Sequence, residues 1–215
     1  MDENTFQRED YLTKKSKIKE FYDKNKIKVY SFFTLIIFII IFFNFYIENK
    51  KKEQIALSES YIDAKIYIEK GQDEKAIEIL KKIAVSKNDT YSVLALFLLL
   101  DKNFVQDKKE ILDLFDHILD NAKFDKDIKN LIVFKKAIFQ SNFVLEDELL
   151  KSLKPLLNDE TVWKPHALLL LGDFYLSKGE KNKAKEFYNE ILSIKDLDKE
   201  FYKKASIQIA YTNNE

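Results

Sequence analysis

The sequence contains no cysteine, only three glycines and only two prolines among its 215 residues. Without cysteine the chain has no disulfide and no thiolate metal site, although this absence does not fix its compartment. A protein built of β-sheets needs frequent turns, and glycine and proline supply most of the chemistry of those turns. Their scarcity favours an all-α chain of long helices with short connections.

Arginine is also scarce, since Arg8 is the only one, and neither sign of charge is in excess. The 36 basic and 36 acidic residues give a formal net charge of zero. Nucleic-acid binding normally leaves a basic footprint, so the composition predicts no nucleic-acid partner. Hydrophobic residues make up 46% of the chain, which is enough for a helical domain with its own core.

One segment, residues 29–47, contains no charged residue over 19 positions. A helix of that length spans roughly 28 Å, close to the thickness of the hydrocarbon core of a bilayer. Tyr30 and Tyr46 lie near its two ends, where aromatic rings favour the headgroup region. A cleavable signal peptide would have a shorter apolar region followed by small residues, which are absent here. We therefore expect an uncleaved transmembrane anchor.

The orientation of this anchor follows from the basic residues that flank it. Seven lysines precede it within about 20 residues and four follow it. This bias predicts a cytoplasmic N-terminus and a large domain on the outer side, although the cluster Lys50, Lys51 and Lys52 opposes it. The expected organisation is a short cytoplasmic segment at 1–28, the anchor at 29–47 and a periplasmic domain at 48–215.

The domain after the anchor has the apolar periodicity of amphipathic helices. Three segments place apolar residues at positions i, i+3, i+4, i+7 and i+8, and therefore along one face of a helix. They are Ala76, Ile79, Leu80, Ile83 and Ala84; Ile111, Leu114, Phe115, Ile118 and Leu119; and Ala184, Phe187, Tyr188, Ile191 and Leu192. Each such stripe predicts a helix that packs against a neighbour.

A pattern of small and aromatic residues occurs twice with the same spacing. Gly172, Tyr175, Gly179 and Ala184 are separated by 3, 4 and 5 residues, and so are Ala64, Tyr67, Gly71 and Ala76. The two copies lie 108 residues apart, or about three repeats of 36. This pattern resembles the tetratricopeptide repeat, a pair of helices that cross closely at the small residues. The interval holds two further pairs, near 90–121 and 125–157, and a helix at 195–211 would cap the array. The predicted fold is an α-solenoid of about four helix pairs plus this capping helix.

Two segments of this array have more than one interpretation. Residues 93–100 are apolar on every side and are most simply a helix buried on several sides; the alternative is an exposed groove for an apolar peptide. Trp163 precedes Pro165, which suits the first turn of a helix. Trp163 is either a packing anchor, the simpler interpretation, or a binding residue.

No residue pattern indicates catalysis, a cofactor or a metal. His117 and His166 lack partners at metal-ligand spacing, and phosphate-binding and nucleophile motifs are absent. The acidic run Glu146, Asp147 and Glu148 is explained as the solvated first turn of a helix. We therefore predict no enzyme activity, no catalytic, cofactor or metal residues and no small-molecule substrate, and the sequence assigns no binding residues.

The order of features along the chain resembles the YfgM-like ancillary subunits of the bacterial SecYEG translocon. The similarity lies in residues 18–25 before the anchor, in residues 89–95, and in Trp163 followed by residues 171–173 and 177–181. The resemblance implies an inner-membrane protein with a periplasmic tetratricopeptide repeat-like domain. Its partners would be SecYEG, the periplasmic chaperone PpiD and secreted chains.

Two functions remain open at this point. The first is an accessory role in protein export, in which the helix pairs hold segments of emerging chains. The second is an anchored scaffold for envelope assembly, such as pilus or cell-wall machinery. A cytoplasm-facing adaptor would require the reverse orientation of the anchor.

Overall fold

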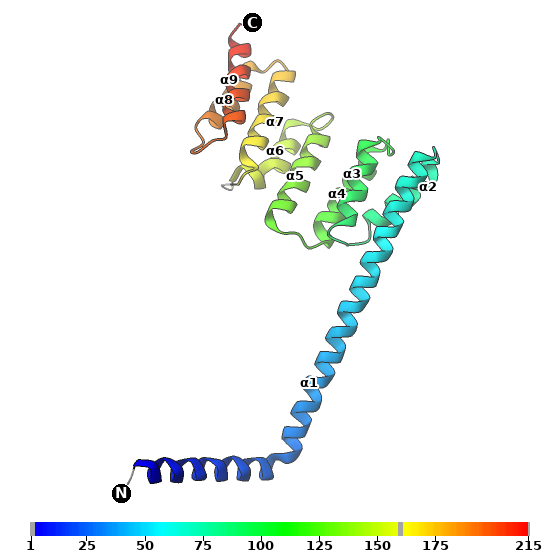
Figure 1. Ribbon diagram of the computed structural model, residues 1–215. Coiled ribbons are helices and arrows are strands. Elements are labelled where there is room, and N and C mark those ends of the chain that lie inside the picture. Colours follow the sequence, from blue (N-terminus) through cyan, green and yellow to red (C-terminus); the bar gives the residue numbers. More distant parts are fainter. Residues whose placement is uncertain (1–2, 159–160, 215) are drawn as a thin grey trace. The chain divides into compact units, whose positions relative to one another are not determined.

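The computed structural model describes residues 3–158 and 161–214, and within them all regular structure is α-helical. The helices, shown in Figure 1, are α1 (Glu3–Glu69), α2 (Asp73–Ala84), α3 (Tyr91–Asp101), α4 (Lys108–Asn121), α5 (Lys126–Gln140), α6 (Glu146–Asn158), α7 (Lys164–Ser177), α8 (Lys181–Leu192) and α9 (Lys199–Asn214). The all-α prediction is confirmed for these residues. The chain divides into two compact units, Met1–Ala56 and Leu57–Glu215.

The first unit contains most of α1, which has one break in its helical backbone, at Asn25 (φ −120°, ψ 20°). The helical segment Lys24–Glu69 is long and apolar enough to cross a membrane, and its apolar window is not buried by protein. No other helix of the described residues meets this criterion of length and composition. The side chain of Asn44, one of the few polar residues of this apolar run, donates its amide hydrogen to the carbonyl oxygen of Ile40 at 2.9 Å.

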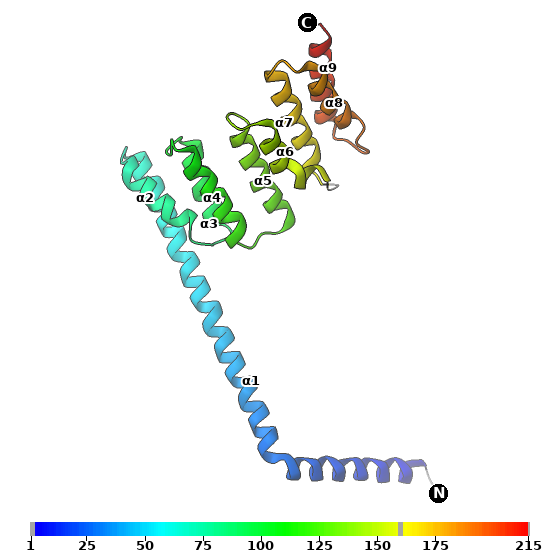
Figure 2. The same ribbon diagram turned by 180° about the vertical axis from the view of Figure 1, so that it is seen from behind.

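The second unit is a succession of helices in which each packs on the next from α2 to α9, as the two views in Figures 1 and 2 show. We call residues 57–69 of α1, together with α3, α5, α7 and α9, the first helices; α2, α4, α6 and α8 are the second helices. The core has two clusters of buried residues, one around Leu96 and Phe115 and one around Leu168 and Tyr188. Helix α5 contributes Ile132 to the first cluster and Ala137 to the second, so it joins the two.

The small residues of the repeated pattern lie where the prediction places them, at close helix crossings. Ala64, Ala76 and Ala184 have no exposed surface. Gly172 of α7 faces Tyr188 of α8 so closely that an added Cβ atom would lie 2.3 Å from Cε1 of the ring. Only a glycine permits this approach of the two helices.

The turn within a pair has the same backbone geometry in three of the pairs. Gly71, Asn103 and Gly179 have positive φ angles of 69°, 52° and 77°. In each case the next residue donates its N–H to the carbonyl oxygen five residues earlier, as Glu180 does to Tyr175 at 2.9 Å. This left-handed ending satisfies carbonyls at the end of the first helix and reverses the chain.

One detail of the predicted array is corrected by the structure, and another is confirmed. The capping helix begins at Lys199 rather than at 195, because Asp196 adopts a positive φ of 55° in the connection before it. Helix α3 is buried on several sides, as predicted: Val93, Ala95, Leu96 and Leu99 are buried, and Leu94 is the one residue of 93–100 that is exposed, at 40%. Most of α3 therefore packs into the core, and the side that carries Leu94 borders a cavity.

Candidate functional site

Several cavities of the second unit open beside α3, α5, α7 and α9, which belong to the first helices. The cavity between α3 and α5, which we call the α3–α5 pocket, has a volume of about 450 Å³. Its walls are mainly apolar and come from Val93, Leu94, Phe97, Phe124, Ile128 and Leu131. Leu94 and Ile128 are each 40% exposed, so the pocket presents aliphatic side chains to solvent.

Polar groups stand at the rim of this pocket. Asp125 is the N-cap of α5, where its carboxylate accepts the N–H of Ile128 at 2.9 Å. Asp89 and Lys123 lie at the same rim. An apolar floor with a polar rim is the usual composition of a surface that binds protein segments.

A second group of cavities lies beside the later first helices, α5, α7 and α9. The one that we call the α7–α9 pocket has a volume of about 260 Å³ and adjoins another of about 420 Å³. Leu169, Asp173 and Lys204 line both of these cavities. Phe134 and Ile138 of α5 also line the α7–α9 pocket. Its lining residues therefore come from three of the first helices.

Aromatic rings from three parts of the chain converge at the α7–α9 pocket. His166 lies against Phe134, Trp163 and Phe201, with ring centroids 5.5, 5.0 and 4.6 Å apart. The Nδ1 atom of His166 donates to the carbonyl oxygen of Val162 at 3.1 Å, which fixes the orientation of the ring. Trp163 thus packs within the protein, as its simpler interpretation held, and Pro165 lies in the first turn of α7 as predicted.

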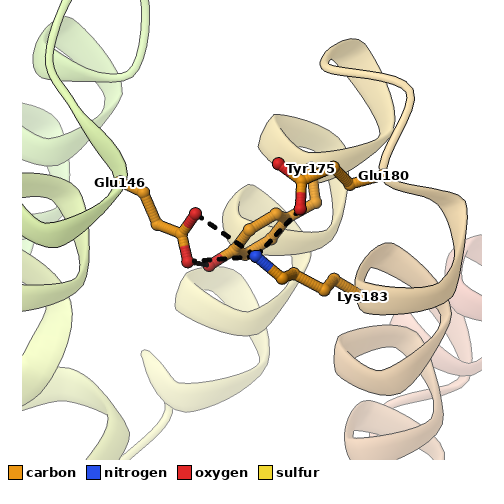
Figure 3. Close-up of polar contacts among 4 residues, drawn as sticks. All are labelled: Glu146, Tyr175, Glu180 and Lys183. Atoms are coloured by element: carbon orange, nitrogen blue, oxygen red, sulfur yellow. Dashed lines mark hydrogen bonds and ion pairs between the residues drawn. The ribbon is translucent and has the colours of Figure 1, made fainter.

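A separate polar cluster joins the N-termini of α6 and α8 to α7, as Figure 3 shows. The hydroxyl of Tyr175 donates to Oε1 of Glu146 at 2.5 Å, and Lys183 lies 3.4 Å from both carboxylate oxygens of Glu146. Lys183 also pairs with Glu180 at 2.8 Å. The Tyr175 ring stacks on Phe187 with centroids 5.3 Å apart.

The electrostatics of this cluster are those of a structural contact. Burial and the hydrogen bond to Glu146 raise the pKa of Tyr175, whereas a tyrosine acting as a base needs a lowered pKa. The hydrogen bonds from Tyr175 and Lys183 lower the pKa of Glu146. Glu146 does lie in the first turn of α6, as predicted, but it also holds α7 and α8, which the sequence did not indicate.

The two histidines do not lie together. The Nε2 atom of His117 on α4 donates to the carbonyl oxygen of Val85 at 3.2 Å, a contact that ties α4 to the end of α2. His166 belongs to the aromatic cluster described above. Among the described residues, no three histidine, cysteine or acidic side chains are grouped so that they could hold a metal ion.

Comparison with protein families gives one match, the tetratricopeptide repeat-like domain, over residues 19–211. The chain belongs to this family. Neither the comparison with curated proteins nor the comparison with solved structures gives a match. Tetratricopeptide repeat-like domains are in general scaffolds that bind other proteins rather than enzymes.

The tetratricopeptide pattern locates the helices but not the cavities between them. The pattern is carried mainly by buried residues such as Gly172 and Ala184, whereas the cavities are lined mostly by residues outside the pattern, such as Leu94, Ile128 and Leu169. The one available signal is that residues 93–100 and 167–171 are apolar on every side. A helix that packs into a core on one side needs apolar residues on the other side only if that side also meets an apolar partner.

Proposed function

We propose that this chain is a membrane-anchored tetratricopeptide repeat-like protein that holds segments of other proteins on the face of its first helices. The observation that carries the proposal is the pair of open apolar cavities on that face, the α3–α5 pocket and the α7–α9 pocket. Their openings suit side chains of a bound segment, and their rims carry polar groups that can orient it.

We place the anchor at residues 29–47, uncleaved, in the bacterial inner membrane, with residues 1–28 in the cytoplasm and 48–215 in the periplasm. Support comes from the length and exposure of the apolar helix and from the excess of lysine before it. A reporter that is active only in the cytoplasm, fused after Glu215, tests this orientation. Activity of that reporter would contradict the periplasmic placement and favour the cytoplasm-facing adaptor.

The specific role that we propose is that of an ancillary subunit of the SecYEG translocon, assisting secreted proteins together with the periplasmic chaperone PpiD. Support comes from the order of the anchor and repeat motifs along the chain, which resembles that of such subunits. Physically, an anchor beside the translocon exit would raise the local concentration of the binding face around an emerging chain.

A photoreactive residue in place of Asn44 tests this role in cells. Asn44 is exposed on the apolar helix, and its donor is already satisfied by Ile40, so the substitution removes no contact to the rest of the protein. Capture of SecY or SecE supports the translocon role. Capture of pilus or cell-wall assembly proteins instead would replace it with the envelope-scaffold function.

A further inference from the structure

The carboxylate of Asp173 occupies a central position on the face of the first helices. Asp173 lines the α7–α9 pocket, the adjoining cavity and a third cavity beside Gly179 and Tyr211. Its Oδ1 atom accepts two hydrogen bonds, from the hydroxyl of Tyr188 at 2.8 Å and from the side-chain amide of Gln208 at 3.3 Å. These contacts come from α8 and α9 and hold the side chain of a third helix, α7, in one orientation.

The carboxylate of Asp173 is not paired with a basic group in the part of the chain that the structure describes. The other acid of the α7–α9 pocket, Glu200, forms an ion pair of 2.6 Å with Lys204. Asp173 has no ion pair of 4 Å or less among the described residues, although Lys204 borders the same pocket. The two hydrogen bonds to this carboxylate come from neutral donors and both end at Oδ1, and Asp173 is exposed, so its charge is accessible to a bound basic group.

Apart from His166 and the ion pair of Glu200 and Lys204, the walls beside this carboxylate are apolar and aromatic. Leu169 and the rings of Phe134 and Phe201 line the α7–α9 pocket, and Ile207, which is 57% exposed, lines the adjoining cavity. Such walls accept the methylene stem of a long basic side chain while the charged head remains at the carboxylate.

We propose that Asp173 anchors a lysine or arginine side chain of a bound protein segment, and that the neighbours of this basic residue are apolar. The proposal rests on the proposed function of this face and specifies the segment that it selects. The basic head group pairs with Asp173, and the apolar neighbours enter the space beside Leu169 and Ile207. An acidic residue at the same place in the segment would meet the unpaired carboxylate and be rejected.

The test uses the full chain in detergent micelles and three labelled nine-residue peptides with blocked ends. The peptides consist of leucine and phenylalanine residues around one central position, which is lysine, glutamine or glutamate, and their dissociation constants are measured by fluorescence anisotropy. We expect the lysine peptide to bind about fivefold more tightly than the glutamine peptide, the upper range for a solvent-accessible ion pair. The preference should shrink as salt is added, because salt screens exposed charges.

The variant Asp173→Asn removes the charge but keeps an oxygen that accepts the hydroxyl of Tyr188. It should weaken binding of the lysine peptide about fivefold and leave the glutamine peptide unchanged. The matched control is Asp120→Asn, at an exposed acid of the second helix α4. It should change the dissociation constant of neither the lysine peptide nor the glutamine peptide. Should Asp173→Asn not fold, the order of the three peptides on the unaltered chain and its salt dependence decide the question.

Equal binding of all three peptides by the unaltered chain would overturn the role of Asp173. If Leu94→Asp then weakened the binding of all three peptides, the proposal that the first helices bind protein segments would be retained. No binding of any peptide would instead overturn both the binding face and the role of Asp173.

Discussion

Gly172 of α7 lies directly under the ring of Tyr188 of α8, with room for a hydrogen atom but none for a methyl group. A Cβ atom on Gly172 would stand 2.3 Å from Cε1 and 2.7 Å from Cδ1 of that ring. Tyr188 has no exposed surface, and its hydroxyl reaches across to Asp173 on the same face as the candidate site. The close crossing at Gly172 and the hydrogen bond that holds Asp173 are therefore built from the same two helices, α7 and α8.

The substitution Gly172→Ala should destabilise the protein, against the trend for helices. In an open helix the change from glycine to alanine stabilises by about 1 kcal/mol. Here the added methyl group must displace a buried ring, and such overpacking costs about 1–3 kcal/mol. Urea unfolding followed by circular dichroism measures the sign, and a gain in stability would contradict the close crossing.

The turn at Asn103 should tolerate glycine and reject a β-branched residue. Asn103 has a φ of 52°, a region that glycine and asparagine enter readily and valine does not. Asn103→Val should therefore lower the free energy of unfolding by about 1–2 kcal/mol, while Asn103→Gly should be close to neutral. Equal stabilities of the two variants in thermal unfolding would rule out a left-handed residue at this position.

Alkaline pH should unfold the domain through its buried tyrosines. Burial is the main cause that raises the pKa of Tyr188 and of Tyr175, and hydrogen bonds to Asp173 and Glu146 add to it. The folded state thus favours the neutral phenols, and this contribution is complete below the unfolded pKa of about 10. Above that pH the unfolded state loses these protons first, so stability falls as pH rises.

Absorbance of tyrosinate, recorded together with circular dichroism, measures this effect. Tyr188→Phe should flatten the loss of stability above pH 10, whereas Tyr202→Phe, at a ring that is 58% exposed, should not. Identical alkaline transitions in the two variants would contradict the prediction.

Acid should weaken the contact between α6 and α7 at Glu146. The hydrogen bond from Tyr175 lowers the pKa of Glu146, with help from Lys183, so the folded state favours the charged carboxylate. This contribution is present above the unfolded pKa of about 4.3 and is lost as pH falls through the lower folded pKa. A double-mutant cycle of Glu146→Gln and Tyr175→Phe should give a favourable coupling at pH 7 that shrinks toward pH 3. A coupling free energy that does not change between pH 7 and pH 3 would contradict the predicted role of the charged Glu146 carboxylate.

The sequence predicted the helices well because their signals are local. Apolar stripes at helical spacing, Gly179 at a helix end and Pro165 at a helix start depend on residues within one or two turns. The turn at Asn103 was not recognised from the sequence, because the pattern has glycine at this position and Asn103 adopts the same positive φ as a glycine. The backbone turn of this pair is nevertheless the same as in the pairs that carry glycine.

The candidate site could not be predicted in the same way, because it depends on residues far apart in the chain. Phe134, His166 and Phe201 come from three helices, and their meeting requires the packing of α5, α7 and α9 together. Asp173 was visible only as part of the repeat motif around Gly172. Its function as a charged group follows from the contacts of Tyr188 and Gln208 and from the pairing of Glu200 with Lys204.

The most direct test of the proposed binding face compares two photoreactive positions in cells. One replaces Leu94, which borders the α3–α5 pocket, and the other replaces Lys151, which is exposed on the second helix α6. We predict discrete adducts with other proteins from position 94, their loss when Ile128→Asp alters the opposite wall, and no such adducts from position 151. The same adducts from both positions, or adducts that survive Ile128→Asp, would contradict binding at the first helices.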